Sequence, residues 1–484
     1  MAIDNFDKIL NKIKSECNGP DLNIKLMNTK RVRISTIYLE TITSTSEMND
    51  AILKSISDDF RHEIKFKDLY NYLYNSISCG SIKTINTYEE IIDNLYNGFV
   101  VVLIDNESKA IACEARASLD RGVSTPSSEA IVRGPKDGFT ENFNKNLGLI
   151  RRRIKTPDLK VIEKKGGRIS KTRIGVMYME NIADKNLVDD IINKIDNVDI
   201  DAILDSGYLR ELIVDDNKSN FPSIMSSERP DKASMALLDG RVVLIFDNSP
   251  FVLIIPTFFV DYFHTPEDYY QKSNNVSFIR IIRFIAFFLS ILTPAFYVAL
   301  VTHNQKNIPT GLLVNFASQR IGVPFPTFVE ALIMMIAFEI LKESDIRLPS
   351  IGGSSVSILG GIIIGDAAVS AGIVSPIMVI VISITAISSL IFSQVDVVSA
   401  IRTYRIIFLI ASTIFGIYGI IILSLFLIIK LTSLEPFNIP FTYPFAPFNL
   451  KEQNDTIIRA ERKKLKYRNF LTAKKNIRRI KKDD

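Results

Sequence analysis

The sequence predicts an α/β soluble N-terminal region of two related subdomains, followed by an α-helical multi-pass membrane domain and a basic cytoplasmic tail. Three observations predict this fold class. Strand-like runs alternate with helical stretches up to about residue 270, long uncharged segments follow between residues 284 and 429, and residues 451–484 carry 13 Lys and Arg against 5 Asp and Glu. The uncharged segment 406–429 has 24 residues, and a bilayer core needs roughly 20. A purely soluble protein is therefore excluded.

Composition narrows the function classes. The chain of 484 residues has a net charge of +5, and the segment 451–484 alone carries +8, so the remainder is slightly acidic. This distribution argues against a basic protein that coats nucleic acid. Cys17, Cys79 and Cys113 lack the spacing of a disulfide framework or a metal site and are predicted to be reduced thiols of a cytoplasmic domain. The N-terminal residues lack the apolar run of a signal peptide, which also favours a cytoplasmic N-terminal domain.

Two related α/β subdomains are expected at residues 1–155 and 156–272. Residues 98–106 (GFVVVLIDN) recur 142 positions later as residues 240–248 (GRVVLIFDN), and a second strand-like run follows each copy. Asp-Asn tolerates the left-handed backbone of a hairpin turn, so each copy is predicted to form a β-hairpin. Coincidence between two Val-rich strands is the alternative interpretation.

An amphipathic helix is predicted near the end of the first subdomain. Apolar residues spaced 4, 4, 3 and 4 apart form one face of this helix, namely Phe139, Phe143, Leu147, Ile150 and Ile154. Three consecutive arginines, Arg151, Arg152 and Arg153, stand at its C-terminal end, where cations complement the helix dipole. Two interpretations stay open for these arginines: a solvated helix end, or a contact with another subunit or with lipid headgroups.

The membrane domain is expected at residues 273–435. Apolar segments predict spans near residues 281–301, 349–372, 376–393 and 406–430. The segment 308–341 contains Glu330 and Glu339 and is predicted to be interfacial or re-entrant. A Pro/Phe segment and the basic C-terminal tail complete the chain at residues 436–484. Because the tail and the N-terminal domain are both expected in the cytoplasm, the number of crossings must be even, and four are predicted.

Small residues recur on one face of a predicted helix, within an arc of about 120°; they are Gly353, Ser357, Gly361, Gly365, Ala368 and Gly372. Such a face lets helix backbones approach closely. The opposite face combines hydroxyls, aliphatic side chains and one carboxylate, namely Ser355, Leu359, Ile362, Asp366, Ser370 and Ile373. In a ring of copies this face would line a pore with an apolar constriction and a ring of carboxylates. The alternative is a tightly packed helix whose Asp366 lies near a membrane surface or pairs with an arginine.

Catalytic motifs are missing from the sequence. It contains no Walker loop, HExxH, GxSxG, paired-Cys zinc pattern or GxGxxG, and its histidines, His62, His264 and His303, are scattered. We therefore predict a protein that is not an enzyme and has no cofactor or metal site.

Several motifs, in their order and spacing, are similar to those of a known family. They are residues 132–141 (VRGPKDGFTE), 149–155 (LIRRRIK), 227–231 (SERPD), 238–243 (LDGRVV), 249–256 (SPFVLIIP), 324–326 (PFP) with Glu330, 348–353 (LPSIGG) and 365–369 (GDAAV). On these motifs the sequence resembles the A subunit of GerA-type spore germinant receptors over nearly its whole length.

This resemblance implies a multi-pass protein of the spore inner membrane in an endospore-forming bacterium, with both termini on the cytoplasmic, spore-core side. It implies two partners, a transporter-like B subunit that binds the germinant and a lipoprotein C subunit. It also implies a homo-oligomer, a pentamer, that forms a germinant-gated cation channel. Two other functions stay open. One is a non-conducting scaffold or signalling subunit, including the relative that accompanies dipicolinic-acid release. The other is a transporter. Inverted repeats are expected in a transporter, whereas the Gly-rich segment at residues 348–365 has no counterpart elsewhere in the predicted membrane domain.

Overall fold

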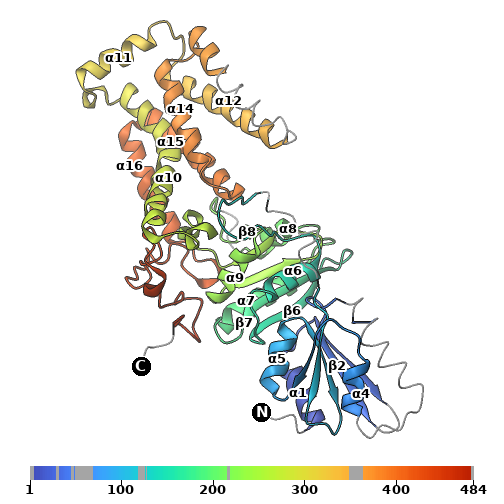
Figure 1. Ribbon diagram of the computed structural model, residues 1–484. Coiled ribbons are helices and arrows are strands. Elements are labelled where there is room, and N and C mark those ends of the chain that lie inside the picture. Colours follow the sequence, from blue (N-terminus) through green and yellow to red (C-terminus); the bar gives the residue numbers. More distant parts are fainter. Residues whose placement is uncertain are drawn as a thin grey trace. The chain divides into compact units, whose positions relative to one another are not determined.

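A computed structural model describes residues 5–28, 32–44, 48–49, 69–117, 126, 128–214, 219–347 and 364–480 (Figure 1). The chain forms two compact units. The α/β unit comprises residues 1–215, 223–257 and 462–484, and the helical unit comprises residues 216–222 and 258–461. The segment 436–484, predicted as one region, is therefore divided between the two units at residue 461.

The first antiparallel sheet has the strand order β1-β2-β4-β5-β3. Its strands are β1 (Leu22–Asn28), β2 (Arg33–Leu39), β3 (Ile82–Ile85), β4 (Phe99–Ile104) and β5 (Ala110–Glu114), and the helices of this subdomain are α1 (Phe6–Glu16), α4 (Leu69–Ser76) and α5 (Tyr88–Tyr96). β4 is a continuous apolar run and is buried along its whole length. Val100 and Val102 share a core with Leu73 of α4, and α5 also packs against β4. Such a run suits a central strand that helices cover.

The second sheet repeats this order as β6-β7-β9-β10-β8. Its strands are β6 (Leu159–Gly166), β7 (Thr172–Met179), β8 (Met225–Ser227), β9 (Val242–Phe246) and β10 (Val252–Ile255), and the helices of this subdomain are α6 (Phe143–Arg151), α7 (Lys185–Asp196), α8 (Ser206–Ile213) and α9 (Pro230–Leu238). Both sheets are antiparallel throughout, and the two predicted hairpins are β4–β5 and β9–β10. The predicted α/β region with two related subdomains is confirmed.

The two hairpins also share their backbone conformations. Asn106 and Asn248, which end the repeated motifs, have φ values of +64° and +67°. Gly98 and Gly240, which begin them, have φ values of +82° and +80°. These left-handed conformations explain why Gly and Asn stand at the same places in both copies.

The helix predicted over residues 139–154 is shorter than expected. α6 begins after Asn142, whose side chain accepts a hydrogen bond from the Lys145 backbone N–H, and it ends at Arg151. Its contacts also differ from the prediction, because it packs against α9 and β9 of the second sheet. α6, which the sequence placed in the first subdomain, thus packs on elements of the second sheet, and the boundary at residue 155 stays a prediction.

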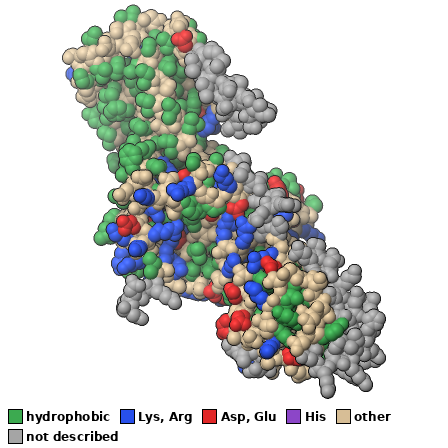
Figure 2. Space-filling view, in the orientation of Figure 1, with side chains coloured by type: hydrophobic (Ala, Val, Ile, Leu, Met, Phe, Trp, Pro, Cys, Tyr) green, Lys and Arg blue, Asp and Glu red, His purple; other side chains and the backbone are tan. Residues whose placement is uncertain are grey.

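The helical unit contains α10 (Ser273–Thr302), α11 (Thr310–Arg320), α12 (Thr327–Arg347), α14 (Pro376–Ser389), α15 (Val395–Phe415) and α16 (Ile417–Thr432). Among the described helices, α10 and α15 are long and apolar enough to cross a membrane, and α14 and α16 are shorter apolar helices. Large apolar side chains are exposed on all four helices, and Figure 2 shows hydrophobic side chains spread over this unit. These features suggest membrane association.

The predicted span near residues 406–430 is not one helix. α15 ends at Phe415 and α16 begins at Ile417, and Gly416 between them has a φ of +61°. A Cβ atom at Gly416 would lie 2.7 Å from the Asn304 side-chain oxygen, which also accepts a hydrogen bond from the Ile417 backbone N–H. This close approach needs a glycine, so the apolar run is interrupted although it contains no charge.

Candidate functional site of the helical unit

The small-residue segment leads directly into α14. Residues 364–370 are helical, and the chain turns at Gly372, which has a φ of +65°. Among the predicted packing residues, Gly365 is buried, and Ala368 and Gly372 are partly buried. A Cβ atom at Gly365 would lie 3.5 Å from the Val379 side chain of α14. Within one chain, the small face therefore meets α14 at Gly365.

The opposite face of this segment is exposed in the single chain. Asp366 and Ser370 are exposed, and 39% of Ile373 is accessible. The other predicted packing and pore positions lie outside the described residues: Gly353, Ser355, Ser357, Leu359, Gly361 and Ile362. The two faces thus differ in burial where they are described, and the pore itself stays a prediction.

A buried carboxylate lies where the small-residue segment meets α14. Glu330, in the first turn of α12, is completely buried. One of its oxygens accepts hydrogen bonds from the backbone N–H of Ser375, at 2.9 Å, and from the Ser375 hydroxyl, at 2.8 Å. The other oxygen lies 3.3 Å from Nε of Arg320, the last residue of α11. Because Ser375 is the N-cap of α14, Glu330 joins α11, α12 and α14 at one point.

A second ion pair joins α12 to α15. The Arg402 guanidinium lies 2.8 Å from the Glu339 carboxylate, and Arg405 lies 4.0 Å from it. Arg405 also donates a hydrogen bond from Nε to the Ser290 carbonyl oxygen of α10, at 2.7 Å. The charges that made the segment 308–341 a poor candidate span are therefore paired inside the helical unit. Sequence reasoning missed these pairs because their partners are 10 to 66 residues away.

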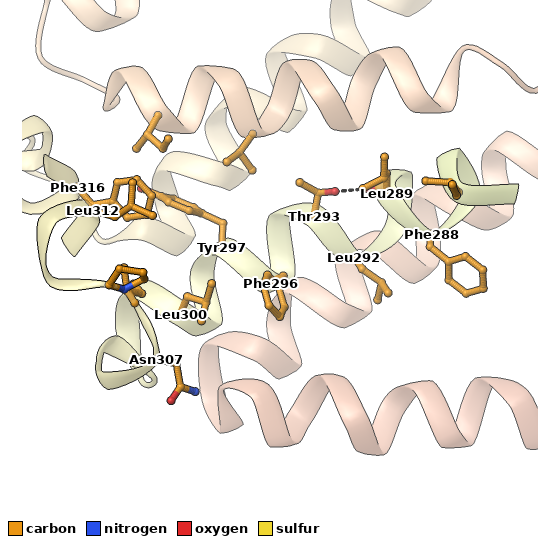
Figure 3. Close-up of a pocket in the computed structure, with 15 residues that line it drawn as sticks. Phe288, Leu289, Leu292, Thr293, Phe296, Tyr297, Leu300, Asn307, Leu312 and Phe316 are labelled. Atoms are coloured by element: carbon orange, nitrogen blue, oxygen red, sulfur yellow. Dashed lines mark hydrogen bonds between the residues drawn. The ribbon is translucent and has the colours of Figure 1, made fainter. Parts of the chain in front are cut away.

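An apolar pocket of about 670 Å³ lies between α10, α11 and α14 (Figure 3). Phe288, Leu292, Phe296 and Leu300 line it from α10, together with Phe316 of α11. Most of the residues that line it are apolar, and the polar ones are Thr293, Tyr297 and Asn307. Within the described ranges, no group of three or more His, Cys, Asp or Glu residues is arranged to hold a metal ion.

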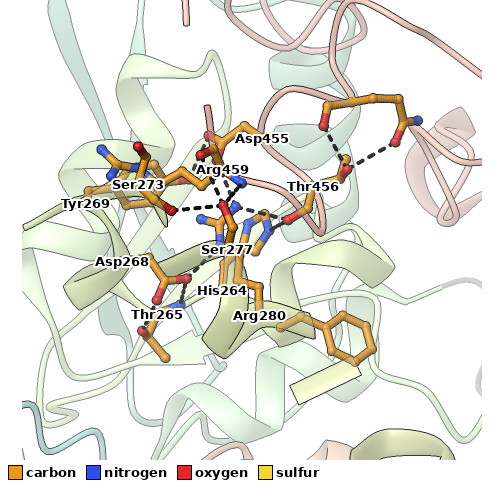
Figure 4. Close-up of polar contacts among 12 residues, drawn as sticks. His264, Thr265, Asp268, Tyr269, Ser273, Ser277, Arg280, Asp455, Thr456 and Arg459 are labelled. Carbon is orange, nitrogen blue, oxygen red and sulfur yellow. Dashed lines mark hydrogen bonds and ion pairs between the residues drawn. The ribbon is translucent and has the colours of Figure 1, made fainter. Parts of the chain in front are cut away.

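A polar cluster fixes the start of α10 (Figure 4). Arg280 is completely buried, and its guanidinium donates to Asp268, at 2.8 Å, and to Asp455, at 2.9 Å. Arg283, one turn further on, donates to the same Asp268 carboxylate at 2.9 Å. Burial alone would raise the pKa of Asp268, but the two arginines outweigh it and hold this pKa below its usual value. The cluster ties residues 436–461 to the first turns of α10.

His264 completes this cluster in its neutral form. Its Nε2 lies 2.8 Å from the Thr456 carbonyl oxygen. Burial, and then the nearby Arg280 guanidinium, lower the pKa of His264 to about 4. Since Nε2 faces a carbonyl oxygen, it carries the proton, and Nδ1 is unprotonated.

Acid is expected to destabilise the helical unit through His264. The unfolded state takes up a proton near pH 6.5 and the folded state only near pH 4, so the free energy of unfolding should fall by about 3 kcal/mol across this window. Thermal melting of the full chain in detergent between pH 7 and pH 4 measures this loss. His264→Gln should flatten the profile, whereas the exposed His303→Gln variant should keep it. If stability depended on pH with the same slope in both variants, the acid sensitivity would not come from His264.

The three arginines at the end of α6 have different environments. Arg151 is 1% exposed, and its guanidinium contacts both oxygens of the buried Asp21 carboxylate at 2.6 and 2.8 Å. Arg153 pairs with Asp137 at 2.5 Å, and Arg152 is exposed. The predicted subunit contact is therefore wrong for Arg151, because its side chain is enclosed in the α/β unit. For Arg152 and Arg153 both interpretations stay open, a solvated helix end or a contact with another subunit or with lipid headgroups.

Arg151→Ala should lower the free energy of unfolding of the α/β unit by about 3–5 kcal/mol, because it leaves Asp21 buried without a cation. Arg152→Ala is the matched control, and a change within about 0.5 kcal/mol is expected for this exposed neighbour. Urea unfolding followed by circular dichroism compares the two variants. A similar, small loss in both would show that the buried pair contributes little.

Comparison with known proteins gives the family. The family described as Bacillus/Clostridium GerA spore germination protein matches residues 6–471. The chain belongs to this family. The resemblance seen in the sequence motifs is thereby confirmed. Spore germination protein KA of Bacillus subtilis (strain 168) is 38% identical over 436 residues, which are 90% of this chain and 80% of that protein.

Other similar proteins carry related names. Spore germination protein GerLA of Bacillus cereus is 33% identical to this GerA-family chain over 468 residues, which are 96% of this chain and 95% of GerLA. Among solved structures, the crystal structure of the N-terminal domain of the A subunit of the Bacillus megaterium spore germinant receptor GerK3 is 26% identical, with a TM-score of 0.43. That match covers 53% of this chain and 97% of that domain.

Proposed function

We propose that this GerA-family protein is the A subunit of a spore germinant receptor, and that it oligomerises in the spore inner membrane to form a germinant-gated cation channel that triggers germination. A pentamer with four crossings per chain and cytoplasmic termini is the expected arrangement. A transporter-like B subunit that binds the germinant and a lipoprotein C subunit would complete the receptor. The names of the relatives support the role in germination.

One observation carries the channel part of this proposal. Asp366 and Ser370 are exposed on a helical segment whose small face, at Gly365, packs within the chain. A carboxylate on the surface of an apolar helical unit requires a polar environment, since hydrocarbon would disfavour it. A ring of copies around an aqueous lumen provides this environment and places one carboxylate per chain at the lumen.

The proposal predicts how Asp366 affects conduction. In planar bilayers that contain the chain with its B and C partners, germinant should open a cation-selective current. Asp366→Asn should keep the response to germinant but reduce the preference for cations over anions, because the ring of negative charge is lost. Asp396→Asn, which removes a carboxylate of α15 instead, is the matched control and should leave the preference unchanged.

The same recordings separate the alternatives. A receptor that binds germinant but never conducts would favour the non-conducting scaffold. Coupled uptake of a solute without channel-like current would favour a transporter. A current whose selectivity responds equally to both substitutions would move the pore away from the Asp366 face.

A further inference from the structure

The basic C-terminal segment, residues 462–480, has a fixed place on the α/β unit. Thr472 is completely buried, and its hydroxyl donates to the Asp239 carbonyl oxygen at 2.6 Å. Gly240 allows this approach, because a Cβ atom there would lie 2.6 Å from the Thr472 carbonyl oxygen. The segment is therefore packed on the turn before β9 and is more than a solvated tail.

This segment presents a strongly positive surface. It contains nine Lys and Arg and no Asp or Glu. Lys474 pairs with Asp184 and Arg479 pairs with Asp239, whereas Arg468 and Lys475 donate to backbone carbonyl oxygens, which do not neutralise their charge. The exposed cations are Arg462, Lys463, Lys464, Lys466, Lys474, Lys475, Arg478 and Arg479. Figure 2 shows Lys and Arg side chains gathered over this part of the chain.

The residues just before this segment are fixed to the start of α10. The Arg459 backbone N–H donates to the Ser277 hydroxyl at 3.1 Å, and its guanidinium donates to the Gln271 carbonyl oxygen at 3.0 Å. Arg462 follows three residues later, and three residues span at most about 10 Å. The positive surface therefore begins close to the polar end of a helix that is long and apolar enough to cross a membrane.

We propose that residues 462–480 bind the anionic headgroups of the membrane that contains α10. Lys and Arg clusters next to a membrane helix attract anionic lipids over a distance of about one Debye length, roughly 8 Å at physiological salt. Arginine adds paired hydrogen bonds to phosphate oxygens. The inference rests on membrane insertion of α10 but not on channel activity. An RNA partner would fit the charge alone, whereas the short chain connection to Arg459, which hydrogen-bonds to Ser277 of α10, favours a lipid surface.

Lysine acetylation of the full chain in nanodiscs tests whether residues 462–480 bind anionic headgroups. The discs contain phosphatidylcholine alone or a mixture with phosphatidylglycerol, and mass spectrometry gives the rate at each lysine. Lys463 and Lys466 should react several-fold more slowly in the mixed discs, and high salt should abolish the difference. Lys109 and Lys145, exposed elsewhere on the α/β unit, should react equally in both discs.

Equal rates at Lys463 and Lys466 in both discs would overturn the proposal, as would protection by an added oligoribonucleotide but not by phosphatidylglycerol. A triple variant, Lys463→Gln with Lys464→Gln and Lys466→Gln, gives a second readout. It should weaken the lipid-dependent protection of Lys475, and unchanged protection would contradict a shared lipid surface. Neither measurement needs germinant, partners or current, so failure here would leave the channel proposal intact.

Discussion

Glu330→Gln is expected to lower the melting temperature of the helical unit by about 6–12 °C, which corresponds to about 3 kcal/mol. Gln keeps an oxygen that can accept from Ser375, so the substitution isolates the loss of charge. The main cause of the loss is Arg320, which would remain beside a neutral group. Because a quarter of the Arg320 side chain is exposed, the loss should fall at the lower end for a broken buried pair.

Two further variants make this test specific. Glu343→Gln changes an exposed carboxylate on the same helix, α12, and should leave the melting temperature nearly unchanged. Arg320→Gln combined with Glu330→Gln should cost less than the sum of the two single variants, because no unpaired charge remains. Additive losses would show that the two groups do not interact. In spores, Glu330→Gln should also weaken the germinant response, since the junction leads into the predicted pore segment.

Ile362→Ala is expected to make the membrane leak ions without germinant. Ile362 stands one turn before Asp366 on the predicted pore face, about 6 Å along the helix axis. An apolar ring closes a narrow pore by excluding water, so a smaller side chain should let water and ions persist. Premature release of spore ions, measured at matched protein levels, is the readout.

Ile364→Ala is the matched control for this leak. Ile364 is only two residues away but lies about 200° around the helix, and 37% of its surface is exposed in the single chain. It should keep a tight membrane that responds to germinant. A tight membrane in Ile362→Ala, with normal protein levels, would place the constriction on another face or another helix. Low protein levels in both variants would instead indicate a packing role.

The β-hairpins show how much of the fold could be predicted from the sequence. The motif that begins with Gly98 and ends with Asn106, and its copy from Gly240 to Asn248, indicated two related subdomains. The structure gives both copies the same left-handed φ values and both sheets the same strand order. These features depend on neighbouring residues, since a positive φ favours Gly or Asn wherever the turn occurs. Local signals of this kind can be read without tertiary contacts.

The lengths of the apolar segments predicted the helices of the helical unit less completely. They predicted α10 correctly as a long apolar helix, but they joined α15 and α16 into one span, because nothing in composition marks Gly416 as a break. The break depends on Asn304, 112 residues earlier in the chain, whose side chain occupies the space beside Gly416. A hydropathy average over neighbouring residues cannot detect a contact with a residue that is distant in the sequence.

The α/β region with its two hairpins, the apolar helices and the family could be predicted from the residues alone, because each depends on residues that are close together or on motifs in a fixed order. Which charges are buried became clear from the folded chain. Arg151 meets Asp21 across 130 residues, Arg280 meets Asp455 across 175, and Glu330 meets Ser375 across 45. A buried charge is stable only beside its partner, so its role depends on folding that brings distant residues together.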